Sequence, residues 1–202
     1  MKKFYAISLV ILCAPLANGF GFSDIVNWTG SGANEAALLI DWQDGTTYPS
    51  LVWGYRWDGT ATGEQMLQAV AAADPDLTVQ ITSYSFGDAV TALGFDGSAY
   101  GPNGPGSHYE SGFSTGSPGF WAYYLGAGES VPTWNESATG AGDRTLTNQA
   151  WDGWSWSANF NDTPPSNPPI AAPVPAPEPA GWFVLGLTML AIRRKRPATR
   201  TV

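Results

Sequence analysis

Apolar and polar residues alternate most clearly in the segment SLVWGYRW, residues 50–57. One face of this segment carries Leu51, Trp53, Tyr55 and Trp57. Such alternation predicts a half-buried strand. The apolar run EAALLIDW, residues 35–42, precedes it, and the turn sequence Gln43-Asp44-Gly45 lies between the two. We therefore expect two antiparallel strands.

The periodicity changes after residue 60. Thr62-Gly63-Glu64-Gln65 fits a capping box, in which the Thr and Gln side chains satisfy backbone N–H groups at a helix start. The apolar stripe that follows consists of Met66, Leu67, Val70 and Ala71. Asp74-Pro75 ends the pattern, since proline cannot continue a helix. We expect the principal helix at about 63–73.

The remainder of the central region has the spacing of β-structure. Strands are expected at 77–86, 119–126, 130–137, 144–149 and 153–160, whereas 88–95 is ambiguous and the Gly- and Pro-rich stretch 98–119 is a long loop. Few helices and many strands in this order predict an α+β domain, mainly antiparallel sheet, over 20–160. Residues 161–176 (DTPPSNPPIAAPVPA after Asn161) are expected to be a Pro-rich linker.

The N-terminus has the pattern of a secretory signal. Two lysines precede a thirteen-residue apolar run, Phe4 to Leu16. Small residues follow at Ala17 and Gly19, which predicts cleavage before Phe20 and a signal peptide at 1–19. An uncleaved anchor is the alternative, but the run is shorter than the roughly 20 residues of a spanning helix. Cleavage removes Cys13, the single cysteine, and with it disulfides and thiolate chemistry.

The C-terminus carries the pattern of a second targeting signal. Thirteen uncharged residues, AGWFVLGLTMLAI at 180–192, predict a short membrane helix. The basic cluster after it consists of Arg193, Arg194, Lys195 and Arg196, which the positive-inside rule keeps cytoplasmic. A short core helix with a basic tail is the alternative.

Pro177-Glu178-Pro179, the apolar helix and the basic tail together resemble the PEP-CTERM sorting signal of Gram-negative bacteria, here at 177–202. The resemblance implies processing by an exosortase, a membrane transpeptidase that recognises Pro-Glu-Pro. It also implies signal peptidase as a partner during export. The precursor would be anchored in the inner membrane, and the product would reach the cell surface or the extracellular biofilm matrix. A sorting signal determines where a protein is delivered and gives no information about the activity of the domain that carries it.

A second and looser resemblance concerns the central domain. GTATGEQMLQAV, GFWAYYLG and LTNQAWDGWSW follow the order of helix, aromatic strand and Trp strand in β-grasp domains of the transcobalamin C-terminal type. The resemblance implies a fold with one helix on a sheet, and a cobamide-like molecule as one candidate ligand.

Charge restricts the partners of this domain. Between residues 20 and 176 there are sixteen acidic residues against two arginines, so the segment carries a net charge of −14. This field repels phosphate backbones, so nucleic acid is excluded as a partner. We expect no cofactor. A calcium ion is the alternative, because hard oxygen ligands would offset the crowded negative charge.

Catalytic motifs are few. Gly112-Phe113-Ser114-Thr115-Gly116 matches a nucleophile elbow, but loop residues flank it where the motif needs a strand and a helix. The single histidine, His108, precedes that serine. Carboxylates that lie near aromatic residues are Asp41, Asp44, Asp58, Glu64, Asp96 and Asp152, and two carboxylates suffice for glycoside hydrolysis. Four of these aspartates precede a glycine, which favours tight turns. We therefore expect no enzyme.

Aromatic residues allow two interpretations. Trp53, Tyr55 and Trp57 share one face of their strand, and Trp154 and Trp156 share a face of theirs. Such rows build the core of a small domain without disulfides. The alternative is an exposed platform on which polysaccharide rings stack. The sequence thus predicts an exported surface or matrix protein without catalytic activity; the alternatives are a binding module for polysaccharide or a cobamide-like ligand, and a carboxylate glycosidase.

Overall fold

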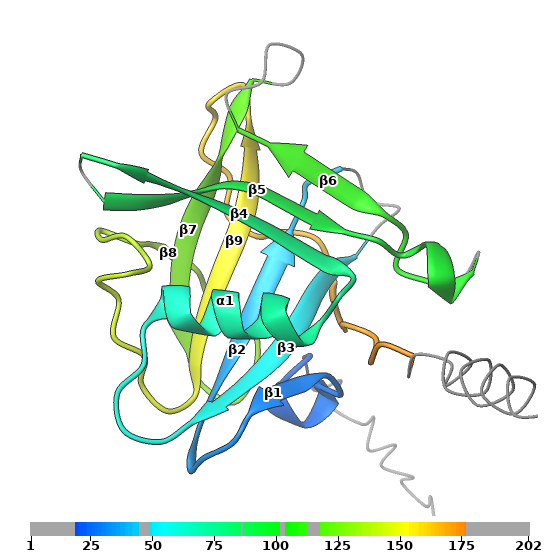
Figure 1. Cartoon of the computed structure of the whole chain (residues 1–202), viewed down its shortest axis with the longest axis vertical. Helices are drawn as coiled ribbons and strands as arrows, with labels where there is room; N and C mark the ends of the chain where they lie inside the picture. The colour runs from blue at the N-terminus through cyan, green and yellow to red at the C-terminus, as the bar shows by residue number, and fades with distance from the viewer. Residues whose placement is uncertain (1–18, 45–48, 86, 102–103, 113–117, 177–202) are drawn as a thin grey trace, which may run out of the picture.

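The computed structural model describes residues 19–44, 49–85, 87–101, 104–112 and 118–176. Strands are their main regular secondary structure, and one α-helix, α1 (Gly63–Ala73), lies against the larger sheet (Figure 1). The strands are β1 (Trp28–Gly30), β2 (Asn34–Asp41), β3 (Ser50–Trp57), β4 (Leu77–Tyr84), β5 (Gly87–Phe95), β6 (His108–Ser111), β7 (Gly119–Ala127), β8 (Asn135–Glu136), β9 (Ala150–Ala158) and β10 (Pro169–Ala171). Two short 3-10 helices, Phe22–Asp24 and Ser98–Tyr100, complete the order.

The strands form two sheets. The larger has seven strands in the order β1-β3-β2-β9-β7-β8, with β10 also paired to β3, and the smaller has the order β4-β5-β6. The expected antiparallel pairing of β2 with β3 is confirmed, with Leu38 opposite Trp53. Three pairs in the larger sheet, β1 with β3, β2 with β9 and β10 with β3, are parallel, so this sheet is mixed.

Helix α1 begins as the sequence predicts. The Thr62 hydroxyl accepts from the Gln65 backbone N–H, and the Gln65 side chain accepts from the Thr62 backbone N–H. The backbone N–H groups of Gly63 and Glu64, in the first turn, donate to the carbonyl oxygens of Arg144 and Ala141. Both carbonyl groups belong to the loop between β8 and β9. This loop is therefore fixed against the start of the helix.

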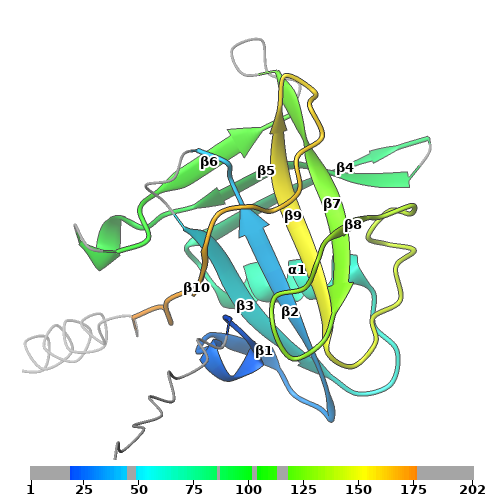
Figure 2. The ribbon, with the colours of Figure 1, turned by 180° about the vertical axis from the view of Figure 1, so that it is seen from behind.

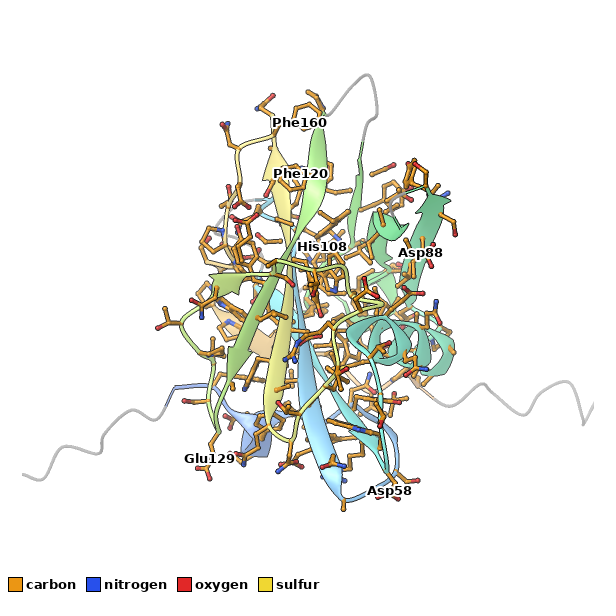
Figure 3. All side chains as sticks on the ribbon, turned by 90° about the vertical axis from the view of Figure 1, so that its left-hand side faces the viewer. Asp58, Asp88, His108, Phe120, Glu129 and Phe160 are labelled. Atoms are coloured by element: carbon orange, nitrogen blue, oxygen red, sulfur yellow. The ribbon has the colours of Figure 1, made fainter. Side chains whose placement is uncertain are left out.

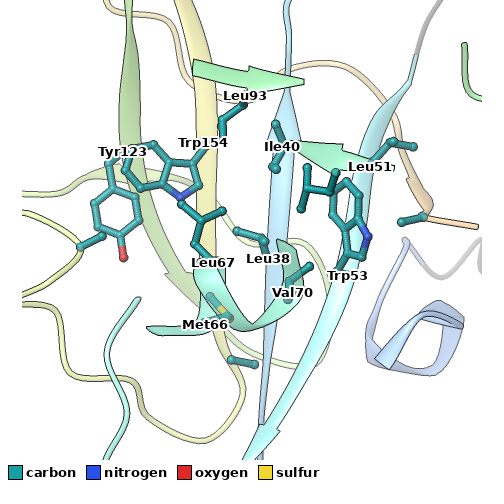
Figure 4. Close-up of a cluster of buried hydrophobic side chains, with 14 of the residues drawn as sticks. Leu38, Ile40, Leu51, Trp53, Met66, Leu67, Val70, Leu93, Tyr123 and Trp154 are labelled. Carbon is teal, nitrogen blue, oxygen red and sulfur yellow. The ribbon is translucent and has the colours of Figure 1, made fainter. Parts of the chain in front are cut away.

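The main core fills the space between the larger sheet on one side and α1 with the smaller sheet on the other (Figure 4). Met66, Leu67 and Val70 of α1 are completely buried there. Each such side chain contributes about 1.5–3 kcal/mol on burial. The opposite face of the sheet is covered by the N-terminal segment, where Phe22 and Ile25 pack on Trp151.

Several expected strand boundaries differ from the structure. The ambiguous segment 88–95 is strand β5, and the expected loop 98–119 contains strand β6. Only Asn135–Glu136 of the expected strand 130–137 pairs. Residues 144–149, expected as a strand, form the loop that caps α1, with one isolated bridge from Thr145 to Thr62.

Residues 161–172, which we expected to belong to a linker, lie along the larger sheet (Figure 2). Buried Asp41 accepts hydrogen bonds from the backbone N–H groups of Ser166 (2.8 Å) and Asn167 (3.0 Å). β10 then pairs with β3, and Ala172 is fully buried. The folded unit thus continues about twelve residues past the boundary expected at 160, because proline-rich sequence can still pair as a short edge strand.

In the described part of the chain, no helix is both long enough and apolar enough to cross a membrane. The expected signal peptide, apart from Gly19, and the sorting segment at 177–202 lie outside the described residues.

Candidate functional site

An apolar pocket of about 350 Å³ lies between the start of β5, strand β7 and the turn at residues 139–141. Five aromatic side chains line it, and we call it the aromatic pocket: Phe120, Trp121, Tyr123, Trp154 and Phe160. In Figure 3, Phe120 at the start of β7 and Phe160 just after the end of β9 lie close together, and Asp88 lies across from them on the β4–β5 hairpin.

The pairing of β7 with β9 produces most of this aromatic wall. Tyr123 lies opposite Trp154, and the two rings stack at 4.5 Å between centroids. Trp121 lies opposite Trp156, with centroids 5.5 Å apart. Cross-strand aromatic pairs of this kind stabilise a sheet and hold the rings in fixed orientations.

Phe160 reaches the pocket through an unusual turn. Asn159 and Phe160 both have positive φ, 54° and 59°, directly after β9 ends at Ala158. The Phe160 ring stacks on Phe120 with 6.4 Å between centroids, and the residue as a whole remains 56% exposed. A left-handed conformation is costly for a bulky residue, and such conformations concentrate at functional sites.

A buried polar cluster adjoins the pocket at Tyr123. The Tyr123 hydroxyl donates to Oδ2 of Asp152, which is fully buried near the start of β9. Oδ1 of Asp152 lies 3.7 Å from Nε of Arg144. Among the described residues, these two atoms and the indole Nε1 of Trp154 are buried without a hydrogen-bond partner. Unpaired buried polar atoms are rare in folded proteins and require an explanation.

Burial perturbs the acidity of this cluster. It raises the pKa of Asp152 to about 6, although the Tyr123 hydrogen bond and the Arg144 charge act in the opposite direction. Burial, followed by the negative charge of Asp152, raises the pKa of Tyr123 well above its ordinary value. A carboxyl group with a shifted pKa next to an aromatic pocket is a pattern typical of binding and catalytic sites.

Another pocket, of about 500 Å³, lies at the N-terminal segment between Gly21, Glu35 and Glu129. Its wall includes Gly19, the residue that the expected signal cleavage removes. The expected cleavage would change the wall of this pocket, so we take the aromatic pocket as the better candidate.

The structure does not support an exposed platform on strand β3. Trp53 and Trp57 are buried in the core, and Tyr55 is half-buried with its ring stacked on Trp57 at 5.6 Å. The indole Nε1 of Trp53 donates to Oδ2 of buried Asp74 at 2.7 Å. These three residues are thus part of the core and its edge, because α1 covers the face of β3 that carries them.

The predicted Asp-Gly turns are confirmed only in part. Asp58 lies in the bend after β3, and Asp96 accepts from the Ser98 backbone N–H at 3.0 Å as turn aspartates do. Asp152 is an exception, since Asp152-Gly153 lies inside β9 rather than in a turn. Gly153 is required there because a Cβ would meet the Trp134 ring at 2.8 Å.

The remaining motif residues are not brought together with the aromatic pocket. His108 is buried, and its ring nitrogens face Asp44 Oδ2 (2.6 Å) and the Pro105 carbonyl (2.8 Å), while Trp42 stacks on the ring at 4.7 Å. Ser114 of the elbow sequence lies outside the described residues. For the calcium alternative, the described residues contain no group of three or more His, Cys, Asp or Glu side chains placed to bind a metal ion.

Most of the predicted sorting residues lie outside the described residues: Ala17, Pro177, Glu178, Pro179 and the cluster Arg193, Arg194, Lys195 and Arg196. Phe20, the expected first residue after cleavage, is described, and its carbonyl accepts from the Val131 N–H at 2.9 Å. The N-terminal edge of the expected domain thus takes part in the fold.

Neither a protein-family model, nor a curated protein, nor a solved structure matches this chain.

The sequence analysis missed Phe160 as a site residue and gave Asp152 only as one of six candidate carboxylates. The Asp-Gly sequence at Asp152 favours a turn over a reactive carboxylate, and Phe160 lies at the end of an expected strand. The available signal was the aromatic alternation in both GFWAYYLG and GWSWSANF, which predicts two aromatic strand faces but not their register.

Proposed function

We propose that this chain is an exported surface or matrix protein of a Gram-negative bacterium, and that its folded domain binds a small ligand. The observation that carries the binding function is the aromatic pocket beside the buried Tyr123–Asp152 pair. Trp154 lines the pocket, and its indole Nε1 is buried without a hydrogen-bond partner among the described residues, a polar group of the kind that fixes the orientation of a ligand in an apolar pocket.

Binding fits this geometry better than catalysis does. A glycosidase needs two carboxyl groups that flank the reacting bond, about 5–9.5 Å apart. Asp152 is covered by Tyr123 and has no exposed surface, and Asp88 is the other carboxylate at the pocket. We therefore propose a non-enzymatic role at the envelope or in the extracellular matrix, where polysaccharide and small metabolites are the available ligands.

The proposed export and sorting rest on the sequence. Pro177-Glu178-Pro179, the apolar run 180–192 and the basic tail support sorting by an exosortase after signal peptidase has acted. The folded unit supports this proposal as well, because the last backbone contact of the domain is at Pro173, whose carbonyl accepts from Asn27 at 2.9 Å. Three residues, 174–176, then separate it from the motif.

Sorting is tested by replacing Pro177, Glu178 and Pro179 with alanine in a host that has an exosortase. The expected result is uncleaved precursor in the membrane fraction, detected by the size of the protein on immunoblots. The matched control replaces Pro173, Val174 and Pro175 with alanine, which leaves the motif intact and should leave processing normal. Normal processing of the first variant would exclude Pro-Glu-Pro as the recognised element.

Binding is tested by the thermal unfolding of the full chain, followed by tryptophan fluorescence, with calcium, neutral and acidic polysaccharides, a cobamide and small organic cations. A ligand that binds the native state stabilises it by about 2.7 kcal/mol at a hundred times its dissociation constant. The binding function predicts a selective rise in Tm that Phe160→Asn abolishes. A Tm indifferent to every compound would contradict it.

A further inference from the structure

We propose that the aromatic pocket binds a small organic cation, an ammonium group with apolar substituents such as a quaternary amine. The inference rests on the proposed binding function and names its ligand class. Three independent observations carry it: the composition of the pocket wall, the distribution of charge and the conformation of Phe160.

The wall of the pocket presents aromatic rings from three places in the chain. Phe120, Trp121 and Tyr123 come from β7, Trp154 from β9 and Phe160 from the turn after β9. The faces of such rings are electron-rich and attract a cation within about 6 Å of the ring centre. Several rings around one pocket therefore favour a cation whose substituents are themselves apolar.

The charge on the described lining of this pocket is negative. Asp88 is the only charged residue among those described as lining it. Neither arginine of the domain lines the pocket, although Arg144 belongs to the buried cluster beside Tyr123. Arg56 lies 4.1 Å above the Trp28 ring and 3.7 Å from Glu35, and Arg144 lies 3.7 Å from Asp152. With a net charge of −14 over residues 20–176, the domain attracts cations and repels anions.

Phe160 is held at the mouth of the pocket by a backbone that does not suit it. Its φ of 59° and that of Asn159, 54°, are both left-handed, and the residue is 56% exposed. A residue that favours this conformation, such as asparagine, would relieve the strain. Retention of an exposed phenylalanine is explained when the ring covers a ligand together with Phe120.

A neutral sugar fits the same wall less well. Each ring hydroxyl of a buried sugar needs a hydrogen-bond partner. The described lining side chains that offer polar groups are Asp88, Thr139, Tyr123 and the two tryptophans, and Tyr123 already donates to Asp152 while Trp121 Nε1 donates to the Glu110 carbonyl at 3.2 Å. An ammonium group with methyl substituents requires no directional partner at all.

The test compares choline with its uncharged isostere, in which carbon replaces the ammonium nitrogen. Both are titrated into the full chain, purified in a non-ionic detergent, and binding is followed by tryptophan fluorescence and calorimetry. Trp121 and Trp154 line the pocket, so their emission reports occupancy. We expect saturable binding of choline, at least tenfold tighter than that of the isostere and weaker at high salt.

Two variants locate the binding site. Phe160→Asn should weaken choline binding at least tenfold while Tm is unchanged or higher, because asparagine tolerates positive φ. Asp88→Asn should weaken choline severalfold and leave the isostere unaffected. The matched control is Tyr109→Ser, which removes an aromatic ring that is 61% exposed on β6, outside the pocket, and should leave binding unchanged.

The outcomes separate this inference from the proposed function. Equal affinity for choline and the isostere would contradict a cation as the ligand and leave the binding function in place. A response to a neutral glycan or a cobamide without a response to choline would have the same meaning. Choline binding that Phe160→Asn does not weaken would overturn the site. No response to any compound would overturn both proposals.

Discussion

The hydroxyl group of Tyr123 on β7 donates a hydrogen bond to the carboxyl group of Asp152 on the neighbouring strand β9, and the Asp152 side chain is fully buried. The two residues are not direct cross-strand partners, since Tyr123 lies opposite Trp154 and Asp152 lies opposite Leu125. The bond therefore runs diagonally across the pair of strands. It joins the aromatic pocket to the start of α1, where Gly63 lies against both side chains.

The first prediction concerns the pH dependence of folding. Burial raises the pKa of Asp152 from 3.8 to about 6, so the folded protein binds more protons than the unfolded chain between these values. The stabilisation is complete below about pH 4 and is lost as the pH rises through about 6. A tenfold change in the protonation equilibrium corresponds to about 1.4 kcal/mol. A rise in the pKa from 3.8 to about 6 therefore gives a loss of folding free energy of at most roughly 3 kcal/mol.

Denaturant unfolding at several pH values from 4 to 7 measures this loss. Asp152→Asn keeps an acceptor for Tyr123 and does not titrate, so its free energy of unfolding should vary less over this range. Glu110, whose pKa burial also raises, contributes with the same sign in both proteins and cancels from the difference. Parallel pH profiles for the two proteins would contradict the raised pKa of Asp152.

The second prediction concerns Gly63, the first residue of α1. Gly→Ala substitutions within helices usually stabilise by about 1 kcal/mol. Here an added Cβ would lie closer than 3.0 Å to both the Tyr123 hydroxyl and Asp152 Oδ2. We expect Gly63→Ala to destabilise by about 1–3 kcal/mol instead, through overpacking.

Chemical denaturation of Gly63→Ala beside Gly140→Ala provides the comparison. Gly140 lies in the adjoining loop, and the nearest atom to a Cβ there is the Asp88 carbonyl oxygen at 3.9 Å, an ordinary contact. Stability should fall only for the helix variant. A more stable Gly63→Ala protein would mean that α1 is not packed on the Tyr123–Asp152 pair.

Local features of the fold could be predicted because local residues determine them. The capping box at Thr62 and the apolar stripe on residues 66–71 specify α1, and the alternation in residues 50–57 specifies β3. The parallel pairing of β2 with β9 could not be predicted, because it joins residues more than a hundred positions apart. Sequence periodicity gives the faces of a strand but not its neighbour.

The candidate site was harder to predict for the same reason. Asp152-Gly153 has the residue types of a turn, and tertiary packing overrides that preference by placing Trp134 over Gly153. Phe160 enters the site through a left-handed turn that no glycine marks. The Pro-rich segment 164–169 has the composition of a linker, and it packs through hydrogen bonds to residues distant in sequence, with Asp41 and with Ser50.

The third prediction tests whether Trp53 is a core residue or part of an exposed binding platform. This side chain is fully buried and donates to Asp74, which also accepts from Asn27 at 3.0 Å. Trp53→Ala should cost about 3–5 kcal/mol of the free energy of unfolding. Trp53→Phe keeps most of the ring and removes the N–H, so we expect a cost of about 1–3 kcal/mol. Urea unfolding measures both, and a Trp53→Ala protein of unchanged stability would contradict the core assignment.

The last prediction concerns Asp41, which holds the segment after β9 on the sheet. Its carboxylate accepts from Ser166 N–H, from Asn167 N–H and from the Asn167 side-chain amide at 2.8 Å, and it also accepts from Gln43. Asparagine has one acceptor oxygen and places an NH₂ group where donors point at it. Asp41→Asn should therefore cost about 2–4 kcal/mol, since buried hydrogen bonds to a charged group are the strong ones.

The substitution should also release the segment itself. Asp41→Asn removes the hydrogen bonds to Ser166 and Asn167, which lie just before β10 in the chain. Residues 161–172 should then become accessible to proteases at temperatures where the remainder of the domain is folded. Limited proteolysis with mass spectrometry would detect cleavage there. Asp143→Asn, at an exposed loop position, is the matched control and should show neither effect. If the Asp41 variant is cleaved no faster than the control, the hydrogen bonds from Ser166 and Asn167 do not hold the segment, and the contacts of β10 with β3 must be sufficient.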